Sequence, residues 1–296
     1  MIAGDTMRLR IEHVTSYAYR RPVSFHRHRL VLRPRDGHDL RVERMHLELA
    51  PAHRLQWVRD VFGNSIALVD WLEPSDTLRI VSDVVIERLS PFPARDLGEP
   101  WQVTFPPSYD ELEAAIVAVY SAPTYAEDVA TVQEWLRAAP EGDARDAEGT
   151  MLALCRRVFS TVQYLRRMEK GVQTPGQTLA IGSGSCRDMA TLLMEAARLS
   201  GVAARFASGY LHGPASLAGR ASTHAWTELY LPTLGWRGFD PTTGSTTSAS
   251  HIVTGVSTHP RGVMPVSGSF TGARADRIGL DVTVTTTVLG EVDGSV

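Results

Sequence analysis

The spacing of hydrophobic positions changes twice along the chain. In residues 7–90, apolar residues alternate with polar ones or gather in short β-branched runs such as residues 81–86, a pattern typical of strands. In residues 109–160 the spacing becomes helical, and beyond residue 200 strand-like segments return. The pattern predicts an α+β protein in which an N-terminal antiparallel β domain precedes a core of helices packed on an antiparallel sheet.

Three apolar stripes in residues 109–160 predict three helices that face the core. They are formed by Leu112, Ile116, Val119 and Tyr120, by Val129, Val132, Trp135 and Leu136, and by residues 151–159.

Composition shifts divide the chain into three predicted parts. Residues 7–92 form the N-terminal β domain, residues 93–245 the core, and residues 246–296 a C-terminal loop and β-strand segment, with Pro91, Phe92 and Pro93 as the exit from the first part. Gly, Ser and Thr are abundant in residues 244–272, which predicts a loop, whereas residues 280–289 alternate Val with Thr, which predicts a last strand that joins a sheet.

A Gly/Ser run at residues 182–185 brings Cys186 to the first turn of a helix predicted to end at residue 199. Ser185 and Asp188 form an N-cap pair that fixes the start of this helix. The unpaired N–H groups and the positive end of the helix dipole favour a thiolate there, and leave the Cys186 N–H free to bind an oxyanion. The alternative is a small buried cysteine, because residues 186, 190, 193 and 197 share one helix face.

A histidine and an aspartate follow on predicted strands at residues 223–231 and 236–240. Paired residues of an antiparallel ladder have numbers that add to a constant. His224 and Asp240 share a face only if that constant is even: 464 pairs them directly and 466 sets them diagonally. We predict an even sum, with a bulge near the turn at residues 232–235.

Composition limits the possible partners and compartment. The chain has 296 residues and a formal net charge of −3 with interspersed charges, so we expect no nucleic-acid partner. The first residues lack the pattern of a signal peptide and no apolar run could span a bilayer, so we expect a cytoplasmic protein that does not engage a membrane. A disulfide between the two cysteines, Cys155 and Cys186, is not expected in a reducing compartment, and Cys155 lies in an apolar helical pattern typical of a core.

Three short segments, residues 184–190, 224–232 and 235–242, resemble in order the core motifs of the bacterial transglutaminase-like superfamily of cysteine proteases. Residues 13–19 and 60–64 resemble the β domain that often precedes this core. The resemblance implies a papain-like core with Cys186, His224 and Asp240 as a catalytic triad. These residue types fit acyl transfer, with a nucleophile, a base and a group that orients the base.

The resemblance also implies a thioester intermediate, which either water or an amine resolves. We expect a peptidase or amidase acting on a peptide or amide substrate, and no cofactor or metal. A peptidase or amidase is preferred over a cross-linker because the sequence shows neither calcium loops nor a secretion signal, both of which are common among cross-linkers. The alternatives are a protein cross-linking transglutaminase, a catalytically inactive binding or scaffolding relative, and a zinc site formed by the same three residues.

Neighbouring residues carry further expectations. Family members often use an upstream aromatic to assist the oxyanion, and Tyr164 is the candidate here. We expect Arg187 to pair with a nearby acid, and Glu228 either to support the site or to be solvated. Trp226 and Trp236 are expected to pack beneath the site, and residues 166–176 to form either a cleft rim or an ordinary surface loop.

Overall fold

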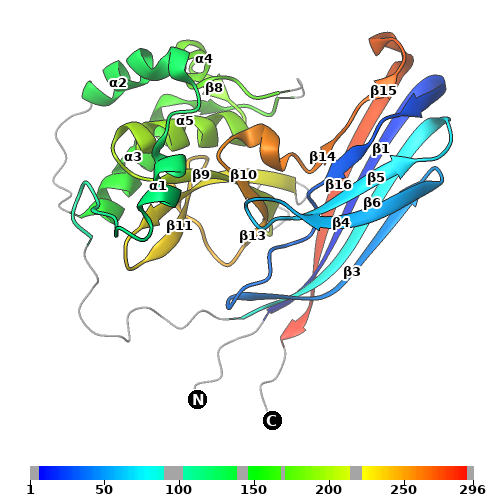
Figure 1. The fold of residues 1–296 in the computed structure, drawn as a ribbon, viewed down its shortest axis with the longest axis horizontal. Helices are drawn as coiled ribbons and strands as arrows, with labels where there is room; N and C mark the ends of the chain where they lie inside the picture. The colour runs from blue at the N-terminus through cyan, green and yellow to red at the C-terminus, as the bar shows by residue number, and fades with distance from the viewer. Residues whose placement is uncertain (1–6, 90–102, 139–145, 168–170, 214–221, 292–296) are drawn as a thin grey trace.

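The structure, a computed structural model, describes residues 7–89, 103–138, 146–167, 171–213 and 222–291. Antiparallel strands form an elongated β domain on one side, and helices cover a second sheet on the other (Figure 1). The predicted α+β class is therefore confirmed. The predicted exit at residues 91–93, and with it the boundary between residues 92 and 93, lies outside the described residues.

Two antiparallel sheets make up the β domain. Its strands are β1 (Met7–Phe25), β2 (His28–Leu30), β3 (Leu40–Ala50), β4 (His53–Arg59), β5 (Ser65–Trp71), β6 (Ser75–Arg88), β14 (Val266–Ser267), β15 (Phe270–Thr271) and β16 (Arg277–Glu291). One sheet has the order β15-β1-β6-β3, with β16 also paired to β1, and the other has the order β14-β2-β5-β4. The two sheets bury a shared cluster that includes Leu30, Leu49, Val69 and Ile80.

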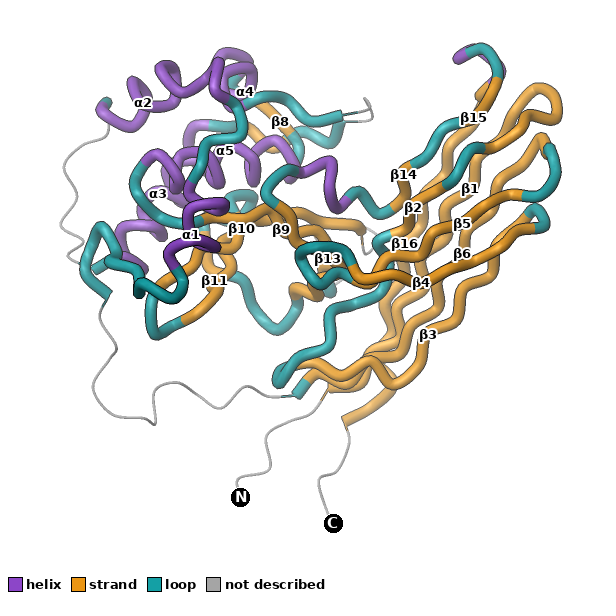
Figure 2. The backbone as a smooth tube through the Cα atoms, viewed as in Figure 1, coloured by secondary structure: helices purple, strands orange, loops and turns teal. Residues whose placement is uncertain are grey.

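The core consists of helices on one antiparallel sheet. The helices are α1 (Ala114–Ser121), α2 (Val129–Arg137), α3 (Ala147–Thr161), α4 (Pro175–Ile181) and α5 (Cys186–Leu199), with short 3-10 turns η2 (Ala126–Asp128) and η3 (Pro260–Val263). A further 3-10 turn, η4 (Arg274–Asp276), lies in the β domain between β15 and β16. The strands are β7 (Gln163–Tyr164), β8 (Ser183–Gly184), β9 (Ala204–Leu211), β10 (Ser222–Leu231), β11 (Gly235–Asp240), β12 (Ser245–Thr246) and β13 (His251–Ser257). The main sheet has the order β12-β11-β10-β9-β13, and Figure 2 shows the helices gathered beside it.

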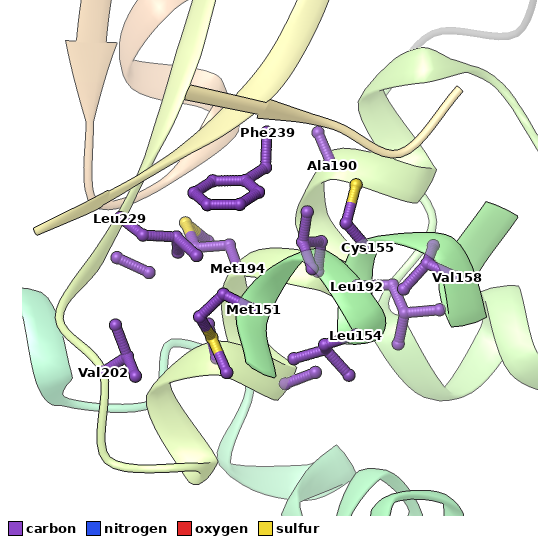
Figure 3. Close-up of a cluster of buried hydrophobic side chains, with 14 of the residues drawn as sticks. Met151, Leu154, Cys155, Val158, Ala190, Leu192, Met194, Val202, Leu229 and Phe239 are labelled. Carbon is purple, nitrogen blue, oxygen red and sulfur yellow. The ribbon is translucent and has the colours of Figure 1, made fainter. Parts of the chain in front are cut away.

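Helix α5 is the centre of the core. Its apolar residues pack against Met151 and Cys155 of α3 and against Leu229 and Phe239 of the sheet (Figure 3). The Thr227 hydroxyl also donates to the carbonyl of Ala190, at 2.8 Å, which ties β10 directly to α5. These contacts fix the start of α5 relative to β10 and β11. None of the helices within the described ranges is long and apolar enough to cross a membrane.

The three helices predicted in residues 109–160 are present, but the first apolar stripe was assigned to the wrong side. Leu112, Ile116 and Val119 are exposed, and Val117 is the buried residue of α1. This helix has only eight residues and apolar side chains on all sides, so periodicity could not select its inner face.

The C-terminal part contributes to both halves of the molecule. The loop predicted at residues 244–272 is wrong, because β13 pairs with β9 in the core sheet and β14 and β15 join the β domain. The predicted last strand is confirmed as β16, which pairs with β1 from Met7↔Glu291 to Tyr19↔Arg277. The first and last strands therefore lie side by side (Figure 1). The three-part division itself stays a prediction.

A turn of the β domain inserts into the core. Gly63 has a φ of 74°, and the Asp60 carboxylate accepts from the N–H groups of Phe62 and Asn64. Asn64 is fully buried: its side-chain amide donates to the carbonyl of Val256 at 2.8 Å and accepts from the N–H of Val256 at 2.9 Å. Asn64 thus satisfies the backbone of β13 as a neighbouring strand would.

We expect Asn64→Ala to lower the free energy of unfolding by about 2–4 kcal/mol, because it leaves two buried backbone groups of Val256 without partners. Urea denaturation measures this change. Gln56→Ala, at an exposed position of β4, is the control and should change stability by less than about 0.5 kcal/mol. Equal effects of the two substitutions would contradict the role assigned to Asn64.

Candidate active site

Cys186 occupies the first position of α5. Ser185 is the N-cap, and the Asp188 carboxylate accepts from both the N–H and the hydroxyl of Ser185 at 2.8 Å. The predicted hydrogen bonding of Asp188 back to the N-cap residue, Ser185, is thus confirmed. Cys186 is partly exposed and reduced, whereas Ala190 and Leu193 on the same helix face are fully buried. Its sulfur is therefore not simply another core atom.

Asp188 also binds the segment that precedes α4. Its buried carboxylate accepts from the Arg167 guanidinium at 2.8 Å and from the N–H of Gln173 at 2.7 Å. A Cβ on Gly184 would lie 2.8 Å from the Asp188 Cβ, so only glycine fits there. Of the predicted loop at residues 166–176, Arg167 and Gln173 are held to the start of α5, and residues 168–170 lie outside the described residues. The end of the predicted loop is wrong, because α4 begins at Pro175 with a Thr174–Gln177 capping box.

The hairpin of β10 and β11 brings His224 to Asp240. Its ladder runs from Thr227↔Phe239 to Leu231↔Gly235, so paired residue numbers add to 466. The predicted even register is confirmed and has the diagonal form, but the predicted bulge is wrong, because this ladder has no register shift. His224 Nε2 lies 2.8 Å from Asp240 Oδ2. Two of the three residues selected from the sequence, His224 and Asp240, are therefore in direct contact.

Asp240 is fully buried and accepts four hydrogen bonds. Oδ1 accepts from the N–H of Thr242 at 2.9 Å and from its hydroxyl at 2.7 Å. Oδ2 accepts from His224 Nε2 at 2.8 Å and from His251 Nε2 at 3.2 Å. Thr242 is not among the site residues predicted from the sequence, and His251 begins β13, where the sequence predicts a loop.

The charges of the site favour an ionised aspartate beside a protonated histidine. Burial opposes the charge on His224, but hydrogen bonds to Asp240 and Cys186 and the negative charges of both raise the pKa of His224 to about 10. Burial likewise opposes ionisation of Asp240, but hydrogen bonds from His224, His251 and Thr242 lower the pKa of Asp240 below its ordinary value. With Nε2 of His224 bound to Asp240, Nδ1 is the ring nitrogen available to Cys186.

Two family models match separate parts of the chain. Residues 9–87 match the model of the bacterial transglutaminase-like N-terminal region, and residues 139–241 match the model of the transglutaminase-like superfamily. The resemblance found in the sequence is confirmed. The chain thus contains one region similar to the bacterial transglutaminase-like N-terminal region, followed by one similar to the transglutaminase-like superfamily.

Relatives and a solved structure extend the match to nearly the whole chain. An uncharacterized protein of Mycobacterium tuberculosis is 28% identical over 281 residues, which cover 90% of this chain and 88% of the relative. One of Mycobacterium leprae is 26% identical and covers 94% and 98%. A crystal structure from Cytophaga hutchinsonii, named a "Putative Cysteine Protease", has a TM-score of 0.72 at 16% identity and covers 97% of this chain and 92% of that one. That likeness shows a shared fold.

Tyr164 lies near Cys186. It pairs with Gly184 in the short parallel ladder of β7 and β8, two residues before Cys186. Burial and the charge of Cys186 raise the pKa of Tyr164. Its side chain is half exposed.

Other expected neighbours have mixed outcomes. Among the described residues, no acid lies within salt-bridge distance of Arg187, so the preferred pairing is not found. Glu228 is neither solvated nor at the triad, because it forms an ion pair with Arg205 at 2.7 Å. Trp226 packs beneath the site against His224 and His251, as expected. Trp236 instead stacks under Arg205.

The geometry favours hydrogen bonding over metal binding. His224, Asp240 and His251 offer ligand atoms within 4.8 Å of one another. Two ligands of a tetrahedral zinc ion lie about 3.3 Å apart, whereas His224 and Asp240 are at 2.8 Å. In the zinc alternative, the ligands would be Cys186, His224 and Asp240. Because Nε2 of His224 is bound to Asp240, only Nδ1 is left for Cys186, so these three residues do not converge on one ion.

Cys155 should be inert in the native protein. It is fully buried, and burial with the nearby charge of Asp240 raises the pKa of Cys155 to about 12. We expect iodoacetamide at pH 8 to leave Cys155 unmodified until the protein is unfolded, as measured by peptide mass spectrometry. Modification of Cys155 in the folded protein at a rate similar to that of free cysteine would contradict its placement.

The raised pKa of His224 predicts a pH-dependent contribution to stability. A group whose pKa is higher in the folded state stabilises the protein fully below its unfolded pKa, about 6.5 for histidine. The free energy of unfolding gained from His224, measured as wild type minus His224→Gln by urea denaturation, should fall as pH rises from about 6.5 towards 10. A difference that increases over this range would show that His224 is not held protonated by its partners.

Proposed function

We propose that this protein is a cysteine acyl-transfer enzyme that hydrolyses an amide or peptide bond, with Cys186 as the nucleophile. The observation that carries the proposal is the position of His224, which lies between the sulfur at the start of α5 and a buried carboxylate. A protonated imidazole beside a thiolate is the reactive pair of thiol hydrolases.

In the acylation step, the Cys186 thiolate attacks the substrate carbonyl carbon and forms a tetrahedral intermediate. His224 donates its proton to the leaving nitrogen, the C–N bond breaks, and a thioester remains on Cys186. His224 then accepts a proton from water as the water oxygen attacks the thioester. The C–S bond breaks, the carboxylic acid leaves, and the thiolate and imidazolium are restored.

Two donors are available for the developing oxyanion. The first is the N–H of Cys186, which lies in the first turn of α5, where backbone N–H groups lack partners within the helix. The second is the Tyr164 hydroxyl, whose strand pairs with Gly184. Asp240 holds the His224 ring and stabilises its positive charge through both steps.

We expect Cys186→Ala to abolish turnover and to abolish labelling by a library of thiol-reactive peptide probes near neutral pH. Cys155→Ala is the matched control, because it removes the other cysteine and leaves the site intact; its labelling should equal that of wild type. Probe preference would report the substrate side chains.

Product analysis by mass spectrometry, with and without an added primary amine, separates hydrolysis from amine transfer. We expect the free acid under both conditions. A dominant amide product would point to cross-linking instead. Turnover that persists in Cys186→Ala, or a wild-type Cys186 that labels no faster than free cysteine, would defeat the proposal.

A further inference from the structure

His251 reaches the site from the far edge of the core sheet. It begins β13, which is separated from β11 and Asp240 by β9 and β10. Its Nε2 nevertheless lies 3.2 Å from Asp240 Oδ2, the same oxygen that binds His224. Both imidazoles are buried. The carboxylate that orients His224 is therefore shared between two histidines.

The hydrogen bonds of His251 fix its tautomer. The backbone N–H of Ser248 lies 3.1 Å from His251 Nδ1, and a backbone N–H can only donate. Nδ1 is therefore an acceptor, and the ring proton is on Nε2, which points at Asp240. The Ser248 carbonyl in turn accepts from the N–H of His251 at 3.0 Å, which closes a tight turn around the ring.

Packing holds the ring in this position. The Trp226 ring meets it edge to face, with centroids 5.1 Å apart. Gly209 of β9 pairs with His224 on one side and with Val253 on the other. A Cβ at Gly209 would lie 2.9 Å from the Trp226 ring and 2.0 Å from the carbonyl oxygen of Ile252. The absence of that side chain leaves room for Trp226 under the two histidines.

We propose that His251 is a positioning residue that holds the Asp240 carboxylate in the orientation required by His224. This inference rests on the proposed function for its catalytic consequence. An ionised carboxylate has about four acceptor sites, and here Thr242 fills two, His224 one and His251 the fourth. With all four filled, the buried carboxylate cannot rotate without losing a hydrogen bond.

Few other titratable groups interact with Asp240. The negative charge of Asp240 raises the pKa of Cys155 in α3 and of Tyr164 in β7. Cys186 of α5 interacts with His224, which in turn binds Asp240. Burial opposes ionisation of Asp240, and the His251 hydrogen bond is among those that offset it. Without this hydrogen bond, the pKa of Asp240 should rise. On acidification, Asp240 should then become protonated, and stop orienting His224, at a higher pH than in the wild type.

The test compares His251→Phe, which keeps a ring against Trp226 but removes the donor, with His251→Gln, whose amide can donate from an equivalent position. Iodoacetamide labelling of Cys186 is followed from pH 4 to 9. At pH 5 we expect labelling of His251→Phe to fall about tenfold, as for loss of a hydrogen bond to a charged group, with its acid limb moved to higher pH. His251→Gln should restore much of the wild-type profile.

Thr254→Val is the control for damage to the strand. Thr254 is buried on β13 and its hydroxyl donates to the Ser208 carbonyl, without contact to Asp240. The Thr254→Val substitution should lower stability and leave the pH profile of Cys186 labelling unchanged. A folded His251→Phe with the wild-type rate and profile would overturn the proposal, as would a stoichiometric zinc ion that is lost in that variant.

A spectroscopic measurement separates this inference from the proposed function. Long-range 1H–15N correlation of the imidazoles should show His251 as the Nε2–H tautomer at neutral pH, in wild type and in Cys186→Ala alike. An Nδ1–H tautomer would sink the assignment. If wild-type Cys186 labels no faster than free cysteine while His251 has the expected tautomer, the proposed function fails and the arrangement around Asp240 stands.

Discussion

The site depends on one fully buried carboxylate. An ionised group is costly to remove from water unless paired and hydrogen-bonded, and Asp240 meets this requirement with donors from β10, from β13 and from the turn after β11. Since the partners come from separate segments, the carboxylate can be both buried and ionised only when these segments are in place. The orientation of His224 is thus a consequence of how the charge of Asp240 is accommodated.

A second buried carboxylate, Asp188, positions Cys186. Asp188 joins the start of α5 to Arg167 and Gln173, which lie on the segment before α4. The helix start therefore has fixed partners outside the helix, and the position of Cys186 does not depend on local capping alone. Asp240 positions His224 and Asp188 positions the start of α5 that carries Cys186, while the Thr227–Ala190 hydrogen bond joins β10 to α5.

The parts of the site governed by local rules could be predicted from sequence. Ser185 and Asp188 mark a helix start by their spacing, and the two-residue period of strands limits His224 and Asp240 to an even register. His251 could not be found this way, because its role depends on β13 lying beside β9, and it also falls beyond the matched core at residues 139–241. For Asn64, the sequence predicts only that it lies in a turn. Its hydrogen bonds to Val256 depend on how the two halves of the molecule pack and could not be predicted. The buried face of α1 was predicted wrongly for a different, local reason: a short helix with apolar residues on all sides does not show by its sequence which side faces the core.

The structure gives a physical reason for the N-terminal region to accompany the core. Strand β13 is the edge of the core sheet, and an uncovered edge leaves its backbone groups without partners. Residues of the β domain cover it: Asn64 binds both backbone groups of Val256, and the N–H of Arg35 donates to the carbonyl of Val253 at 2.9 Å. The same strand begins with His251 and so supplies the fourth hydrogen bond of Asp240. Contacts that hold β13 against the β domain therefore also maintain the environment of the site carboxylate, so the two regions form one structural unit around Cys186.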